Sequence, residues 1–186
     1  MVTLSSGDQR RLLALARRAL EARVRGDRPP EIERGGGLDL HLGAFVTIHR
    51  ANELRGCLGR LDRDRPIAEH VVHLAAIVSD SDPRFPPVRA AELPLIAIQI
   101  SALTAEQEVA DIEAIEVGRH GLIVEHGRRR GLLLPQVAIE YDWDRITFLA
   151  HTCLKAGLPS DAWRNGARIF CFEAQVFGED DLQFQG

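Results

Sequence analysis

A nearly continuous run of apolar residues, LPLIAIQISAL at residues 93–103, restricts the fold more than any other feature of the sequence. Its length and composition are typical of a central strand. Two further segments, residues 43–61 and 120–135, each place apolar runs on both sides of a turn sequence, which predicts two hairpins. A central strand accompanied by hairpins predicts a mainly antiparallel sheet.

Helical spacing of apolar residues predicts one helix that begins near Ser6 and ends before Gly26, and a second over residues 66–79. A further strand is expected near residues 168–177. Because the strands group in hairpins, with no regular alternation of strand and helix, we expect an α+β fold. The sheet is mainly antiparallel and helices flank it.

The composition of the 186 residues predicts a single domain over residues 1–186, since 45% are hydrophobic and 27% are charged. The net charge of -4 argues against a nucleic-acid partner. The start of the chain lacks the order of a signal peptide, and no window has the length of a membrane span. We therefore expect a cytoplasmic protein without a membrane partner.

Three cysteines, Cys57, Cys153 and Cys171, stand far apart and form no C-x-x-C pair. In a reducing compartment they remain thiols, and Cys153 and Cys171 are expected to be small buried hydrophobic residues. His70 and His73 could face one ion from the same side of a helix, but no third ligand follows from a motif. No metal site and no disulfide are predicted.

Six short motifs follow one another along residues 40–179. They are GAFVTIHR, LRGCLG, DPRFPP, GRHGLIV, LLPQVAIE and KAGLP with a later tryptophan. Together they resemble the AMMECR domain family, whose prokaryotic members are called AmmeMemoRadiSam system protein A. The resemblance implies a large lobe and a smaller lobe, with a cleft between them toward which the motifs gather. It also implies genomic association with a Memo-like protein and a radical S-adenosylmethionine protein, while activity and cofactor stay unknown.

The motif LRGCLG predicts a strand whose two faces carry different residues. Alternation places Arg55, Cys57 and Gly59 on one face and the leucines with Gly56 on the core face. A three-residue loop over residues 51–53 would align Thr47 and His49 with Cys57, whereas a loop of two or four residues would bury the thiol among apolar side chains. The amphipathic pattern favours the three-residue loop.

Two interpretations of this motif stand side by side. In the first, Cys57 is a nucleophile or redox-sensitive thiol, Arg55 lowers its pKa or holds an anionic group, and Gly56 and Gly59 let a ligand approach the backbone. In the second, Cys57 is a packed residue, and the glycines serve close packing against a helix.

Five more residues are candidate ligand-binding groups. Asp82 and Arg84 lie at the edge of a cleft or form a rigid turn by pairing with each other. Gln136 and Glu140 are spaced to share one helix face, where they bind a polar ligand or are solvated. Lys155 is a ligand-binding amine or balances the dipole at a helix C-terminus.

Two functions remain open at this stage. The first is an enzyme or enzyme partner that acts on a small molecule or a protein side chain around Arg55 and Cys57. The second is a non-catalytic adaptor or binding module. The Memo-like protein and the radical S-adenosylmethionine protein are the expected partners in either case.

Overall fold

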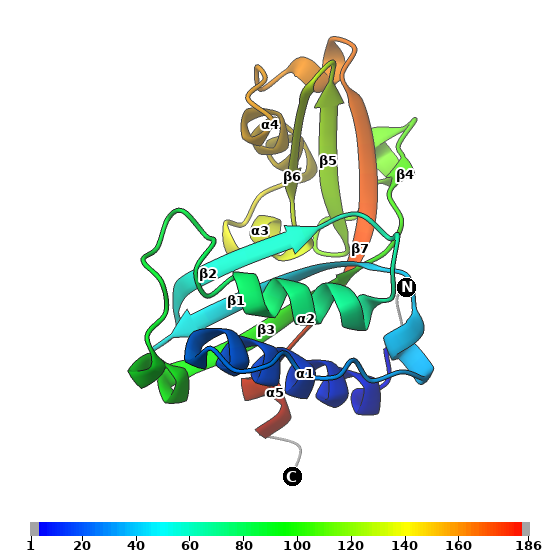
Figure 1. Cartoon of the computed structure of the whole chain (residues 1–186). Coiled ribbons are helices and arrows are strands. Elements are labelled where there is room, and N and C mark those ends of the chain that lie inside the picture. Colours follow the sequence, from blue (N-terminus) through cyan, green and yellow to red (C-terminus); the bar gives the residue numbers. More distant parts are fainter. Residues whose placement is uncertain (1–3, 184–186) are drawn as a thin grey trace. The chain divides into compact units, whose positions relative to one another are not determined.

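The structure is a computed structural model that describes residues 4–183, and these residues form two compact units. The larger unit contains residues 4–103 and 175–183, and the smaller unit contains residues 104–174. Each unit buries its own apolar core, so each can be understood by itself. Figure 1 labels the helices and strands of both units.

The larger unit combines two long helices with one end of the sheet. Its helices are α1 (Ser6–Arg25), α2 (Ile67–Ile77), α5 (Glu179–Gln183) and the 3-10 helices η1 (Gly36–Asp39) and η2 (Ala90–Leu95). Its strands are β1 (Gly43–Arg50), β2 (Glu53–Arg60), β3 (Ile96–Leu103) and the end of β7 (Arg168–Gly178). Among residues 4–183, no helix has the length and apolar character needed to cross a membrane.

Helix α1 begins and ends at capping residues. The Ser5 hydroxyl accepts a hydrogen bond from the amide of Asp8 at 3.1 Å, which satisfies one of the free amides of the first turn. At the other end, Gly26 has a φ of 76°, a left-handed conformation that glycine adopts without steric cost. The helix boundaries therefore follow from local sequence.

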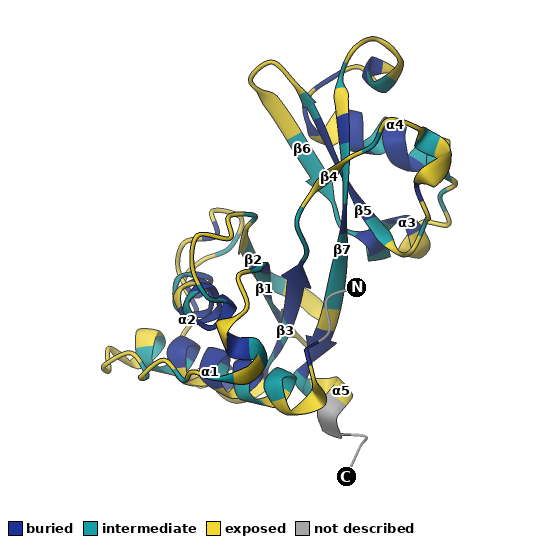
Figure 2. Ribbon diagram, turned by 90° about the vertical axis from the view of Figure 1, so that its right-hand side faces the viewer, coloured by how far each residue is buried: buried dark blue, intermediate teal, exposed yellow. Residues whose placement is uncertain are grey.

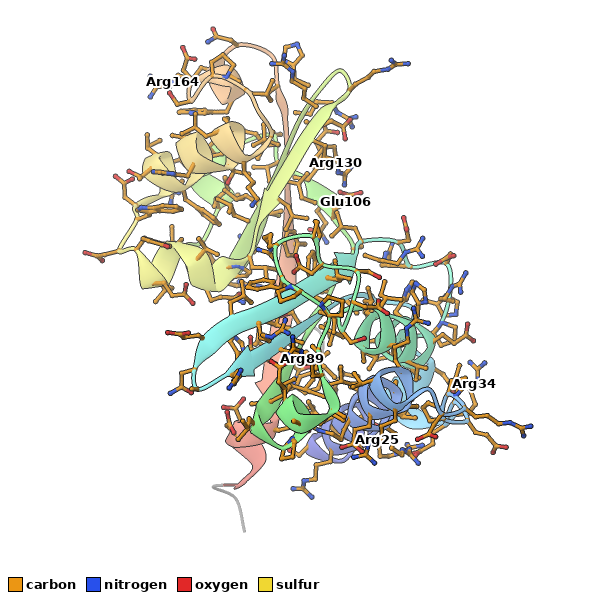
Figure 3. The ribbon with its side chains drawn as sticks, turned by 60° about the vertical axis from the view of Figure 1, so that its left-hand side comes forward. Arg25, Arg34, Arg89, Glu106, Arg130 and Arg164 are labelled. Atoms are coloured by element: carbon orange, nitrogen blue, oxygen red, sulfur yellow. The ribbon has the colours of Figure 1, made fainter. Side chains whose placement is uncertain are left out.

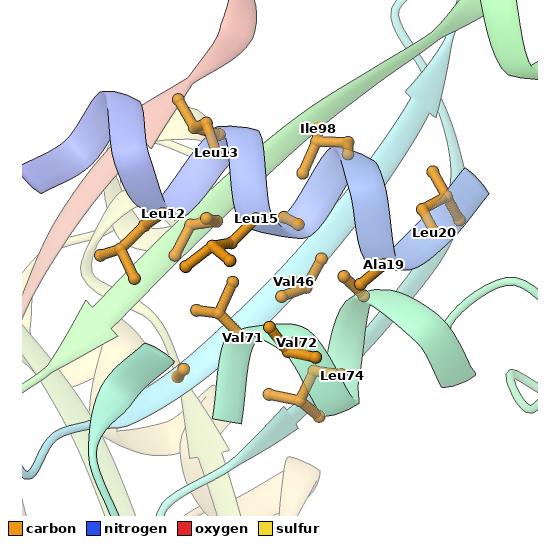
Figure 4. Packing of buried hydrophobic residues seen from close by; sticks show 14 of the residues in the cluster. Leu12, Leu13, Leu15, Ala19, Leu20, Val46, Val71, Val72, Leu74 and Ile98 are labelled. Atoms are coloured by element: carbon orange, nitrogen blue, oxygen red, sulfur yellow. The ribbon is translucent and has the colours of Figure 1, made fainter. Parts of the chain in front are cut away.

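The core of the larger unit lies between the two helices and one face of strands β1 and β3 (Figure 4). Val46 and Ile98 point from the strands, and Leu15 and Val71 point from the helices into the same cluster. These side chains are almost fully removed from solvent, while the outer side of α1 stays exposed (Figure 2). Along α2 only His73 is exposed. Burial of this apolar area stabilises the pairing of helices with sheet.

The smaller unit contains the remaining strands and two helices. They are β4 (Gln107–Glu108), β5 (His120–His126), β6 (Arg129–Leu133), most of β7, α3 (Pro135–Glu140), α4 (Arg145–Lys155) and the 3-10 helices η3 (Ile112–Ala114) and η4 (Ala162–Arg164). Its cores are built around Leu122 and Phe148 and around Val124 and Cys153.

The strands follow the order β2-β1-β3-β7-β5-β6, with β4 paired to β7. The pairs β1–β2, β1–β3, β4–β7, β5–β6 and β5–β7 are antiparallel. This confirms the predicted α+β class with a mainly antiparallel sheet and flanking helices. The first hairpin, the central strand and the C-terminal strand belong to this one sheet, as predicted from the sequence.

Two of the cysteines differ from each other in burial. Cys153 is fully buried in the smaller unit, as predicted, and burial raises the pKa of its thiol. Cys171 is only half-buried, because its side of β7 borders a hollow that Gln107 and Arg119 also line. Its thiol pKa is raised for the same reason, so the expectation of two fully buried thiols was correct for Cys153 alone.

Candidate functional site

The hairpin that carries Cys57 turns through two residues, where the sequence predicts three. Ala51 and Asn52 have φ values of 51° and 64°, which match the mirror-image turns that join twisted antiparallel strands. Strand β2 then contains one extra residue, Arg55, at a β-bulge opposite Ile48 and His49. The short turn and the bulge together shift the register by the same amount as a three-residue loop.

This register has one confirmed consequence and one correction. Thr47 lies directly opposite Cys57, as predicted. Leu54 was predicted on the core face, but it lies opposite His49 and is 42% exposed. The bulge is the physical reason, because an extra residue reverses the alternation for the part of the strand before it.

Cys57 is half-buried on the edge strand β2. The Thr47 hydroxyl donates to Cys57 Sγ at 3.3 Å, and the Cys57 amide donates to Asp82 Oδ2 at 2.9 Å. Its carbonyl oxygen lies 3.5 Å from Arg84 Nη2. The main chain of Cys57 is thus the point where the segment after α2 is attached to the edge of the sheet.

The Arg55 guanidinium is paired with a carboxylate. Its Nε lies 3.0 Å from Glu92 Oε1 and its Nη2 lies 3.3 Å from Glu92 Oε2. Both side chains are largely buried, with 13% and 15% of their surface exposed. Hydrogen bonding to Arg55 holds the pKa of Glu92 below its ordinary value. Arg55 is therefore engaged by Glu92.

Asp82 and Arg84 form the rigid turn that was one of the two interpretations of DPRFPP. Asp82 is 3% exposed and accepts bonds from the Arg84 amide at 3.1 Å, Nε at 2.9 Å and Nη2 at 2.7 Å. These bonds, with the one from the Cys57 amide, hold the pKa of Asp82 far below its usual range. The turn is fastened to β2 by a buried, ionised carboxylate.

The two glycines of LRGCLG serve close packing in this structure. A Cβ added to Gly59 would stand 2.2 Å from the Phe45 ring, and a Cβ added to Gly56 would approach Val78 O at 3.1 Å. Gly59 therefore leaves room for an aromatic ring across the strands, and Gly56 leaves room for the end of α2. The packing interpretation accounts for both positions.

We call the turn that Asp82 and Arg84 attach to β2 the strap. An open hollow with a volume of ≈ 450 Å³ lies beside it. Three arginines and one glutamate line it together with apolar residues of DPRFPP and η2. They are Arg50, Arg55, Arg89, Glu92, Pro86, Pro87, Ala91 and Leu95. Figure 3 labels Arg89 beside this part of the chain. The motifs LRGCLG and DPRFPP thus meet at one basic hollow in the larger unit.

Sequence reasoning missed Arg50, Arg89 and Glu92, which are the charged groups that complete the hollow. Glu92 accepts from the Arg89 amide at 2.9 Å and lies 3.4 Å from Arg50. Together with Arg55, these residues make four charged groups that line the hollow, and they come from two segments that are distant in the sequence. Only the pairing of Arg55 with a carboxylate somewhere in the chain could have been anticipated, from the general rule for buried charges.

The other three candidate residues lie in the smaller unit. Gln136 and Glu140 are both on α3, at the predicted spacing. Glu140 is exposed, while Gln136 Oε1 is buried and has no hydrogen-bond partner within residues 4–183. Lys155 is exposed in the last turn of α4, where its charge suits the helix dipole.

No group of three or more His, Cys, Asp or Glu side chains in the described part of the chain is arranged to hold a metal ion. The charged residues of the larger unit are instead distributed between the Asp82–Arg84 strap and the arginine-lined hollow. The chemistry that this arrangement supports is recognition of an anionic group by guanidinium groups.

The fold and the site define a class of small α+β proteins in which a glycine-rich edge strand is strapped by a proline-rich turn. The chain belongs to the AMMECR1 family, whose sequence model matches residues 13–177. It is 41% identical to the protein Mbar_A1807 of Methanosarcina barkeri, over 96% of this chain and 93% of that protein. It is 42% identical to the protein MK0488 of Methanopyrus kandleri, over 97% and 91%.

A solved structure supports the same assignment. The crystal structure of the uncharacterized protein PH0010 from Pyrococcus horikoshii superposes with a TM-score of 0.84 and 39% sequence identity. The match covers 90% of this chain and 89% of that chain. The fold is therefore common to this chain and its archaeal relative along nearly the whole length.

Proposed function

We propose that the protein is a binding protein whose larger unit recognises an anionic group, carried by a small molecule or a protein side chain, at the hollow lined by Arg50, Arg55 and Arg89. The observation that carries this proposal is the charge balance of the hollow. Three guanidinium groups face it and only one carboxylate, Glu92, compensates them.

The arginines have different tasks in this proposal. Arg55 is fixed by Glu92 and forms the wall. Arg50 has half of its side chain exposed and lies at 3.4 Å from the same carboxylate. Arg89 is exposed, and within residues 4–183 no carboxylate forms an ion pair with its guanidinium. Arg50 and Arg89 are therefore available to a carboxylate or a phosphate, which guanidinium groups bind through paired hydrogen bonds.

The ligand also has an apolar part in this proposal. Pro86, Pro87, Ala91 and Leu95 line the hollow, and Leu95 is 56% exposed. A wall of this kind buries an apolar body while the arginines hold its charge. The ligand class is therefore an organic anion.

We assign the protein the part of an enzyme partner in the cytoplasm. The contacts of Cys57 support a partner rather than an enzyme. Its main chain attaches the strap to the sheet, and Gly56 and Gly59 serve close packing, so these residues have structural tasks. The Memo-like protein and the radical S-adenosylmethionine protein associated with the family are the proposed enzymes. The free thiols of the chain support a reducing location.

Arg89→Gln is expected to abolish the stabilisation of the protein by its anionic ligand. A panel of carboxylates and phosphate esters is screened by thermal unfolding. A ligand present at about 100 times its Kd raises the free energy of unfolding by about 2.7 kcal/mol. Arg25→Gln, which removes an exposed arginine from the same unit, is the matched control. An anion that stabilises the wild type and Arg25→Gln but not Arg89→Gln supports the proposal. Equal stabilisation of both variants contradicts it.

A second candidate function is thiol catalysis, and the position of Cys57, which is not fully buried and accepts a hydrogen bond from the Thr47 hydroxyl at its Sγ, favours it. Alkylation of the folded protein near neutral pH is expected to modify Cys57 before the buried Cys153, because burial restricts access and raises the pKa of Cys153. Mass spectrometry of the labelled peptides measures both rates. A Cys57 rate at or below that of free cysteine supports the binding protein, and a rate at least tenfold above it would establish thiol catalysis as the better reading.

A further inference from the structure

The smaller unit contains a second open hollow, at the tip of the hairpin β5–β6. The tip borders the segment that follows α4, and the hollow between them has a volume of ≈ 410 Å³. Pockets that bind organic molecules have volumes of roughly 300–1,000 Å³, so this hollow accommodates a small ligand. Its residues are separate from those of the arginine-lined hollow in the larger unit.

Three neighbouring arginines at this tip have three different environments. Arg130 is paired with Glu125 at 2.9 Å and with Glu106, which Figure 3 labels next to it. Arg129 donates to the Gly157 carbonyl at 2.9 Å and thereby holds the tip against the end of α4. Arg128 is exposed and lines the hollow, and no carboxylate in the described residues pairs with it. Arg128 therefore presents an uncompensated charge to the hollow.

The floor of the hollow is apolar and rigid. Leu158 and Ala162 are 8% and 6% exposed and belong to the core cluster of Val124 and Cys153. Pro159 lies between them in the chain and also lines the hollow. Because these side chains are fixed by the core, a flat apolar body can bind here at low entropic cost to the protein.

The polar rim adds an imidazole and an acid. His126 lines the hollow on the same hairpin as Arg128. Asp161 lies on the opposite rim, where its carboxylate accepts from Asn165 Nδ2 at 3.1 Å. A hydrogen bond from a neutral amide leaves the charge of Asp161 in place, so the lining contains two arginines, Arg128 and Arg129, and one acid.

We propose that this hollow binds a small organic anion whose phosphate or carboxylate group pairs with Arg128 and whose flat apolar body rests on Leu158 and Ala162. The site goes beyond the proposed function, since it lies in the other unit and uses none of the same residues. A guanidinium group recognises either anion, and the test separates the two.

Backbone amide NMR measures binding of three probes: phenyl phosphate, benzoate and inorganic phosphate. Saturable shifts are expected for phenyl phosphate or benzoate at residues 126–129 and 158–165. Inorganic phosphate is expected to bind at least about tenfold more weakly, because it has no apolar body to bury. The stronger of the two aromatic anions identifies the preferred group.

Matched variants then test the residues. Arg128→Gln is expected to raise the Kd of the aromatic anion about tenfold. Arg130→Gln makes the same charge change on the same hairpin and should change this Kd by less than about twofold. Asp161→Asn keeps an oxygen for Asn165 and removes a negative charge, so it should tighten binding by about threefold.

Several results would overturn this proposal. They are equal loss of binding in Arg128→Gln and Arg130→Gln, shifts confined to other residues, inorganic phosphate binding as tightly as phenyl phosphate, or no saturable shift below about 10 mM. Shifts confined to residues around Arg89 would overturn it while supporting the binding function of the larger unit. The amide spectra of the variants report at the same time whether they are folded.

Discussion

Asp82→Ala is expected to lower the free energy of unfolding by about 3 kcal/mol, because it removes a buried carboxylate with four donors. These donors are the amide of Cys57 and the amide, Nε and Nη2 of Arg84. The Arg84 side chain is 55% exposed and regains water, so the loss is smaller than the sum of four charge-assisted bonds. The backbone amides lose an ionised acceptor and account for most of the effect.

Asp80→Ala is the control for this variant. Asp80 pairs with Arg23 at 2.8 Å near the surface, where 54% of the arginine side chain is exposed, so its loss should cost less than about 1 kcal/mol. Urea unfolding followed by far-ultraviolet circular dichroism measures both variants. Near-equal values for Asp82→Ala and Asp80→Ala would show that the strap contributes little to stability.

The same carboxylate gives the larger unit a defined acid response. The pKa of Asp82 is lowered in the folded state, mainly by the hydrogen bonds from Arg84, while the unfolded chain has an ordinary value of about 3.9. Its stabilisation is therefore present above about pH 4 and is lost as the pH falls through the folded pKa. The stability difference between wild type and Asp82→Asn should shrink below about pH 4 and stay constant above about pH 5.

The strand pattern shows what local sequence could and could not predict. The apolar residues of β1 and β3 correctly predicted strands at these positions, and Val46 and Ile98 of these strands lie in the core. Leu54 was placed wrongly, since a bulge leaves no clear trace in hydrophobic alternation. The register at Thr47 and Cys57 was still correct, because the bulge compensated the shorter turn.

The candidate site was less predictable than the fold because it depends on contacts between distant residues. The partner of Arg55 is 37 positions away, and the acceptor of the Cys57 amide is 25 positions away. Neither pairing follows from spacing or periodicity. The sequence therefore indicated that LRGCLG and DPRFPP are unusual segments, but their attachment to each other and the arginine-lined hollow beside them required the tertiary structure.

Gly131→Ala is expected to destabilise the smaller unit by about 3 kcal/mol. Gly131 lies on β6 opposite Val124, and the end of α4 passes directly over it. A Cβ at this position would stand 2.3 Å from Ala156 N and 2.6 Å from Ala156 Cα. Because the obstacle is backbone rather than the end of a flexible side chain, no rotamer change relieves it, and the helix must move away from the sheet.

Gly127→Ala separates this effect from the conformational freedom of glycine. Gly127 lies in the turn of the same hairpin with a φ of 61°, and a Cβ there would meet nothing within 4 Å. It should cost only about 1 kcal/mol, the penalty of a left-handed conformation. Both tryptophans, Trp143 and Trp163, belong to the smaller unit, so their fluorescence during urea unfolding reports its stability. If Gly131→Ala cost no more than Gly127→Ala, the close approach of α4 to β6 would be refuted; a clearly larger cost would show that the absent side chain at Gly131 fixes where α4 ends on the sheet.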